Sequence, residues 1–80
     1  MSNAEFIEEY GKFEFRDMCK NISQDLVIAK AMKKIGGYKV SNKKKMVLFY
    51  KKDGSKIYLD FATIFTLGID GLERKIMWQK

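Results

Sequence analysis

Lysine is the side chain with the clearest binding chemistry in this sequence, and it is concentrated in two short stretches. Residues 30–34 hold three lysines, and residues 43–45 are three in a row. The formal net charge is +6, from 16 basic and 10 acidic side chains. A charge of this size attracts phosphates, acidic proteins or anionic lipid, and each phosphate that a lysine neutralises releases a counterion. The two stretches therefore predict a surface for an anionic partner.

The same lysines also have a structural interpretation. A lysine-rich hairpin tip is often only a solvated turn, and lysine on an edge strand prevents sheets from aggregating. The coincidence of the two stretches favours binding over this alternative. Three strand aromatics, Tyr38, Phe49 and Tyr58, could stack single-stranded bases. Packing across strands is the commoner role of such residues, and it is the role that we favour.

The residue types present give little support to catalysis or metal binding. The chain has no histidine and a single cysteine, Cys19, which excludes the usual zinc sites and the Ser-His-Asp and Cys-His nucleophiles. Aspartates at positions 17, 53, 60 and 70 stand at predicted caps or turns, where carboxylates bond backbone N–H groups. We therefore expect no enzyme activity, no metal and no cofactor.

Cysteine usage and hydropathy bear on where the protein works. A single cysteine cannot form an intrachain disulfide, which fits a reducing cytoplasm. We expect Cys19 to act as a small buried hydrophobe, as free cysteines commonly do. No stretch approaches the ~20 apolar residues of a membrane span, and the first residues do not resemble a signal peptide. The sequence thus predicts a cytoplasmic protein without membrane contact.

Length and patterning predict a single α+β domain over residues 1–80, with three short helices, a small antiparallel β-meander and a C-terminal helix. The first four residues are expected to be disordered or left over from cloning. The predicted helices cover residues 5–10, 16–21, 22–35 and 71–79, and the predicted strands cover residues 12–15, 38–40, 46–51 and 56–61.

The third predicted helix has a clear end and a less clear core face. The glycine pair at 36–37 is expected to end it, since glycine readily takes the left-handed C-cap conformation. Ile28, Met32 and Ile35 recur at i, i+4 and i+7, which predicts the core stripe. Leu26 falls among the polar positions of this pattern.

Turn and capping signals organise the second half of the chain. The Asp-Gly pair at 53–54 lies between apolar runs, which is a strong hairpin signal. Residues 61–67 could continue the third strand or form a helix capped by Asp60, and we favour the helix. Asp70 and Glu73 have the spacing of a capping box for the last helix.

The element order of residues 5–52 is helix, short strand, helix, helix, strand, basic turn and strand. Two segments carry this order. GKFEF followed by RDMC covers the predicted short strand and the start of the second helix, and AMKKIGGYKV covers the end of the third helix and the first strand of the basic hairpin. This order resembles the winged-helix variant of the helix-turn-helix DNA-binding family, with residues 53–80 as an added strand and helix. The sequence departs from the family in two respects: the third helix lacks arginine, the side chain best suited to guanine, and the turn at 21–23 is tight.

The resemblance implies a small basic protein that binds double-stranded DNA, such as a transcriptional regulator or a phage or mobile-element accessory factor. The third helix would enter the major groove, where Gln24 could meet an adenine edge, and the wing tip would reach nearby phosphates. For Gln24 taken alone, an ordinary polar residue near a helix start is the commoner case. The nucleic-acid-binding residues under this hypothesis are Arg16, Gln24, Lys30, Lys33, Lys34, Lys39, Asn42, Lys43, Lys44 and Lys45.

The C-terminal run is apolar for so short a chain, and tryptophan and methionine are enriched at interfaces. This run could form a homodimer surface or a groove for a protein partner, or it could complete the core. The alternative function is therefore a protein-interaction module or inhibitor. The interface residues under this hypothesis are Phe65, Leu67, Ile69, Ile76 and Trp78.

Overall fold

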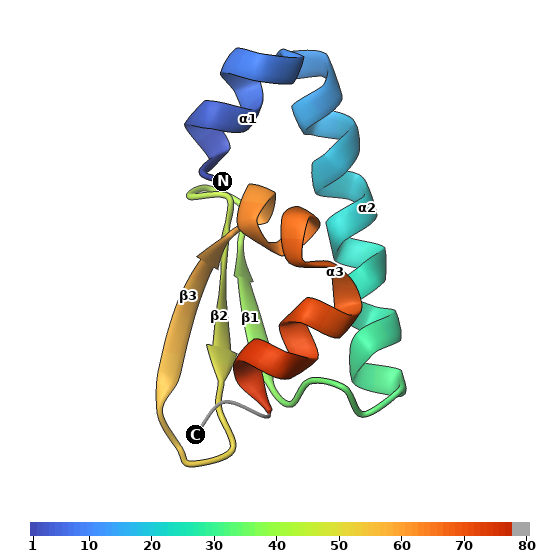
Figure 1. The fold of residues 1–80 in the computed structure, drawn as a ribbon, viewed down its shortest axis with the longest axis vertical. Helices are drawn as coiled ribbons and strands as arrows, with labels where there is room; N and C mark the ends of the chain where they lie inside the picture. The colour runs from blue at the N-terminus through green and yellow to red at the C-terminus, as the bar shows by residue number, and fades with distance from the viewer. Residues whose placement is uncertain (78–80) are drawn as a thin grey trace.

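The computed structural model describes residues 1–77, which form an α+β fold of three helices and one three-stranded sheet. The elements are α1 (Asn3–Tyr10), α2 (Lys12–Ala31), β1 (Tyr38–Ser41), β2 (Met46–Tyr50), β3 (Lys56–Asp60) and α3 (Phe61–Ile76). The sheet is antiparallel with the order β1-β2-β3. In Figure 1, α2 runs along the long axis, α1 leads up to its upper end, and α3 lies between α2 and the sheet.

The second helix is one continuous element, where the sequence predicted a short strand and two separate helices. The predicted strand at 12–15 and the predicted turn at 21–23 both lie inside α2, so both predictions are wrong. Phe13 and Phe15 do not share a face, as the strand required: Phe13 is 74% exposed and Phe15 is buried. Neither glycine nor proline interrupts residues 12–31, and one apolar stripe at three- and four-residue spacing runs through all of them.

That stripe also corrects the predicted core face. Ile22, Leu26 and Ala29 are buried in α2, together with Phe15 and Met18 nearer its start. The prediction placed the core at Ile28, Met32 and Ile35. Ile35 is buried as predicted, but Ile28 and Met32 are about half exposed. The predicted stripe was fitted to the last residues of a short helix. The stripe that forms begins in the first turns of the 20-residue helix, before the predicted third helix starts, and its spacing from there fixes which later residues are buried.

The end of α2 lies earlier in the chain than the glycine pair that was predicted to form it. The amide of Lys34 donates to the carbonyl of Ala29 at 2.9 Å, and that of Lys33 donates to the carbonyl of Lys30 at 3.0 Å. Lys33 has φ 60°, the left-handed value of a Schellman cap. A lysine therefore occupies the position that glycine usually takes, so composition alone pointed to the wrong residue.

The three predicted strands at 38–40, 46–51 and 56–61 are confirmed, with ends that differ by one residue. Tyr38 pairs with Phe49 and Leu48 pairs with Tyr58 in the register of the sheet. The hairpin predicted from the Asp-Gly pair is also confirmed. Both the amide and the hydroxyl of Ser55 donate to Asp53 Oδ1, at 2.9 and 2.6 Å, and these bonds hold the pKa of Asp53 below its usual value.

The helix favoured for residues 61–67 is confirmed, and α3 continues beyond it with a break at Gly68. Gly68 has φ 71°, a conformation that strains any residue with a Cβ atom. The predicted last helix is present as far as Ile76, and residues 78–80 lie outside the described part of the chain. Asp60 stands at the N-cap of α3 but makes no capping bond with its side chain, so that prediction is wrong.

The first four residues, predicted to be disordered, take part in the fold. Ser2 caps α1 in a reciprocal capping box with Glu5. Asn3 connects three elements, because its Oδ1 accepts from the Ala62 amide at 3.0 Å and its Nδ2 donates to the Lys45 carbonyl at 2.9 Å. The Asn3 side chain thus supplies the cap of α3 and ties it to the β1–β2 turn.

Replacing Asn3 with alanine should lower the free energy of unfolding by about 1–2 kcal/mol, because α3 loses its cap and the turn loses a donor. Asn3→Asp keeps an acceptor for the Ala62 amide but cannot donate to Lys45, so we expect a smaller loss. Urea denaturation of the three proteins measures the difference. An Asn3→Ala variant as stable as the parent protein would show that this residue does not connect the elements.

Candidate nucleic-acid interface

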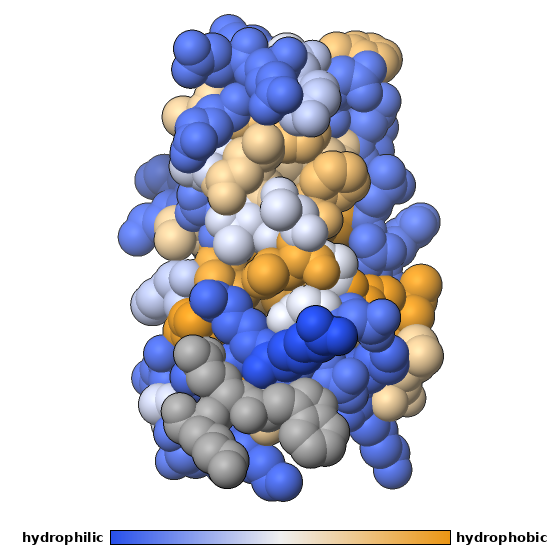
Figure 2. Space-filling model, in the orientation of Figure 1, coloured by the Kyte–Doolittle hydropathy of each residue, from blue (hydrophilic) through white to orange (hydrophobic). Residues whose placement is uncertain are grey.

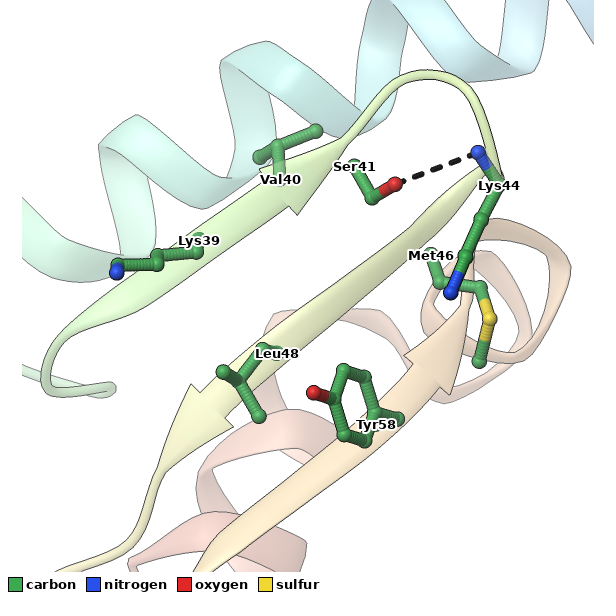
Figure 3. A pocket seen from close by; sticks show the side chains of 7 residues that line it. All are labelled: Lys39, Val40, Ser41, Lys44, Met46, Leu48 and Tyr58. Carbon is green, nitrogen blue, oxygen red and sulfur yellow. Dashed lines mark hydrogen bonds between the residues drawn. The ribbon is translucent and has the colours of Figure 1, made fainter.

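The sheet has one face that the helices do not cover. Side chains alternate along a strand, so the neighbours of the buried Val47 and Phe49 in β2 point away from the helices. Figure 3 views this side, with the helices behind the sheet. We call it the open face, and its residues are Lys39 and Ser41 of β1, Met46, Leu48 and Tyr50 of β2, and Lys56, Tyr58 and Asp60 of β3.

A shallow hollow of about 610 Å³ lies on the open face. Leu48 stands opposite Tyr58 in the register, and the ring of Tyr58 leans toward it in Figure 3. The side chain of Lys44 reaches from the turn to a place beside Met46. The lining residues are Lys39, Val40, Ser41, Lys44, Met46, Leu48 and Tyr58. The hollow therefore has an apolar and aromatic floor with lysines at its edge.

Positive charge stands on both sides of this floor. Lys39 lies on the β1 side, Lys56 lies on the β3 side, and the side chain of Lys44 reaches from the turn to a place beside Met46 (Figure 3). The Nζ of Lys56 is 5.8 Å from the centre of the Tyr50 ring, which places a cation over an aromatic ring of the open face. The one ion pair among residues 1–77 involves none of these lysines. An anionic ligand on the floor would thus meet ammonium groups that have no ion-pair partner among residues 1–77, although the face also includes the carboxylate of Asp60.

The basic turn at residues 42–45 has a fixed backbone and exposed side chains. The Lys45 carbonyl accepts from the Phe61 amide at 3.1 Å as well as from Asn3, and Lys45 has φ 56°. The Ser41 hydroxyl accepts from the Lys44 amide at 3.3 Å. Asn42 and the three lysines of the turn are exposed. The turn is therefore held in place while its charges face solvent.

The lysines at the end of α2 do not join those of the turn. Lys30 holds its Nζ 5.7 Å from the centre of the Tyr38 ring, at the start of β1, whereas the turn follows the end of β1. Tyr38 and Ser41 are about 10 Å apart along the strand. Lys34 is engaged with Asp70 Oδ1 at 2.7 Å, which raises the pKa of Lys34 and lowers that of Asp70. Asp70 was predicted as a helix cap, and this pairing gives it a different partner.

The two remaining predicted contacts lie on α2, away from the open face. Arg16 and Gln24 are exposed, but α2 is separated from the sheet by α3 over most of its length (Figure 1). Gln24 borders a shallow apolar depression with Ser23, Val27 and Ile28. Lys33 lies in another small depression, with Lys52 and Glu73 among its neighbours. The ten predicted residues are thus distributed over several surfaces.

The predicted interface in the C-terminal region is only partly on the surface. Figure 2 shows an apolar patch in the middle of the face over α3. Phe65 is 53% exposed and packs edge-on against Phe6, with 5.8 Å between ring centres. Leu67 and Ile69 are half-buried, whereas Ile76 is buried in the core, which contradicts its assignment to an interface. Trp78 lies outside the described residues.

Two exposed apolar surfaces were not predicted. One is the floor of the open face, for which the unbroken apolar run of β2 was a usable signal, since a strand apolar on both faces has two surfaces to cover. The other is the C-terminal half of α2, where Val27 is 61% exposed beside Ile28 and Met32. The favoured packing role is confirmed for Tyr38 and Phe49, whose ring centres are 6.4 Å apart.

Other kinds of site find little support in the described part of the chain. Residues 1–77 contain no group of three or more metal-ligating side chains, and none of their helices is long and apolar enough to cross a bilayer. Cys19 is half-buried beside the core, and burial raises the pKa of its thiol, which disfavours a reactive thiolate. Comparison with known proteins gives no match to a family model, to a curated protein or to a solved structure.

The open face should contribute little to stability, which makes its residues suitable for binding tests. Tyr58→Ala is expected to lower the free energy of unfolding by less than about 1 kcal/mol, because most of the side chain is already exposed. Phe49→Ala, on the opposite face of the same sheet, should cost about 3–5 kcal/mol. Thermal or urea unfolding compares the two. Equal losses would mean that the face is covered in solution.

Proposed function

We propose that this protein binds nucleic acid on the open face of its sheet, with the β1–β2 turn as an extension of that surface. The observation that carries the proposal is the apolar, aromatic floor around Leu48 and Tyr58 with lysines on both of its sides. Bases present apolar faces and phosphates present charge, so this combination suits both parts of a nucleotide. The net charge of +6 adds attraction at longer range.

The winged-helix hypothesis supports this proposal through one feature, the basic hairpin with Lys43 and Lys44 exposed at its turn. Its recognition-helix part has less support, because α2 is continuous and Gln24 lies in an apolar depression. The proposal therefore assigns the contact to the sheet and the turn. The proposal includes the role that the winged-helix resemblance implies, in regulation or on a mobile element, and places it in the cytoplasm.

A second candidate function is binding to another protein. The apolar strip at the end of α2, formed by Val27, Ile28 and Met32, and the patch around Phe65 favour it. Exposed apolar patches of this kind can mark protein interfaces. This function predicts that polar substitutions on α2 abolish a complex without affecting nucleic-acid binding.

The first function is tested by fluorescence anisotropy with labelled single-stranded and duplex oligonucleotides at 50 and 200 mM salt. The test variant is Lys39/Lys44/Lys56→Ala, and the matched control is Lys12/Lys20/Lys33→Ala, which removes the same charge from α2 and its end. The open-face variant should lose at least about tenfold in affinity at 50 mM salt. The plot of log binding constant against log salt concentration should become shallower, with a slope smaller in magnitude by about 2.

The control should lose far less affinity, because only long-range attraction changes. Equal losses in the two variants would contradict an open-face site. Absence of binding by the unsubstituted protein at 50 mM salt would refute the proposed function altogether.

A further inference from the structure

We infer that the open face selects single-stranded nucleic acid, and that one unpaired base stacks on Tyr58 in the hollow beside Leu48 and Met46. The inference rests on the proposed function and adds the class of nucleic acid and the residue that distinguishes it. Four observations carry it: the exposure of the ring, the nature of its neighbours, the position of the lysines and the position of the helices.

Tyr58 stands in the middle of the edge strand β3, and its ring is well exposed. It is 64% exposed, and it pairs across the strands with Leu48, not with another ring. The other strand aromatics have partners: Tyr38 packs with Phe49, and Tyr50 lies under Lys56. Within residues 1–77, neither Tyr50 nor Tyr58 of this face packs against another ring, but Tyr50 has Lys56 over it, whereas Tyr58 has neither a ring nor a lysine over it.

The surroundings of Tyr58 suit a base more than a charged peptide. Met46 and Leu48 are half-buried and form the floor beside the ring, and the hollow measures about 610 Å³. This volume is within the ~300–1,000 Å³ of pockets that hold small organic groups. A base could rest its edge on the two aliphatic side chains while its face covers the ring.

Lysines are placed where the phosphates on either side of such a base would lie. Lys39 lines the hollow on the β1 side, and Lys44 reaches to it from the turn, beside Met46 (Figure 3). Lys56 precedes Tyr58 by two residues on the same face of β3. Neighbouring strands are about 4.8 Å apart, so β1 and β3 are separated by roughly 10 Å. A short length of chain crossing the strands could therefore meet a lysine on each side of the stacked base.

Duplex nucleic acid fits this surface less well. Its bases are already stacked, and removing one from the helix costs a few kcal/mol. Reading a groove with a helix needs a helix that projects into it, but on this side of the molecule the sheet is the outermost layer and the helices lie behind it (Figure 3). Duplex DNA would thus meet the lysines alone, with no contact to the aromatic floor.

The test measures binding of labelled ten-nucleotide oligothymidylate and oligouridylate, of a hairpin duplex of similar charge, and of phosphatidylserine vesicles. The proteins are the unsubstituted chain, Tyr58→Phe and Tyr58→Ala, with Phe13→Ala as a control that removes a somewhat more exposed ring from α2. We expect the single strands to bind more tightly than the duplex. Tyr58→Ala should lose at least about fivefold on the single strands, while Tyr58→Phe and Phe13→Ala stay within about twofold.

The other outcomes separate this inference from the proposed function. Equal binding of single strand and duplex, with Tyr58→Ala unaffected, overturns the inference but leaves nucleic-acid binding through the lysines intact. Binding to vesicles and to neither kind of oligonucleotide overturns both, and it assigns the face to an anionic lipid surface. A circular dichroism spectrum of each variant excludes misfolding as the cause of any loss.

Discussion

The constraint on which this structure depends is that its helices cover only one face of the sheet. Val47, Phe49 and Leu59 are buried on the helix side, where α3 and then α2 complete the core. Among residues 1–77, no helix packs against the other side of the sheet (Figure 3). Leu48 and Tyr58 consequently remain at the surface, in a sheet that would otherwise bury such residues. The candidate site is a direct result of this one-sided packing.

The open face also depends on contacts that hold its upper end in position. Asn3 caps α3 and binds the Lys45 carbonyl, and the same carbonyl accepts from the first amide of α3. The β1–β2 turn is thereby fixed to two helices through its backbone, while Lys43 and Lys44 keep their side chains in solvent. A fixed turn backbone reduces the entropy lost on binding, and lysine side chains that remain in solvent can adjust to a flexible polymer.

The strands, both hairpin turns and the helix after β3 could be predicted from sequence, because turn residues and alternating or β-rich runs are local signals. The continuous helix α2 could not be predicted in the same way. Its 20 residues are held together by one long apolar stripe, and dividing them into a short strand and two helices hides the spacing of that stripe. The candidate lysines were recognised by type, but their grouping depends on tertiary structure. Tyr58 was considered only among strand aromatics, because its exposure follows from the side of the sheet that the helices cover.

The central claim is that the uncovered side of the sheet is the binding surface, and amide chemical shifts of ¹⁵N-labelled protein test it most directly. Oligothymidylate is added stepwise and the shifts of each backbone amide are followed. The account predicts that the largest changes fall on β1, β2 and β3, around Lys39, Leu48 and Tyr58. Changes concentrated on α2 around Gln24 and Val27, with the sheet unaffected, would contradict it.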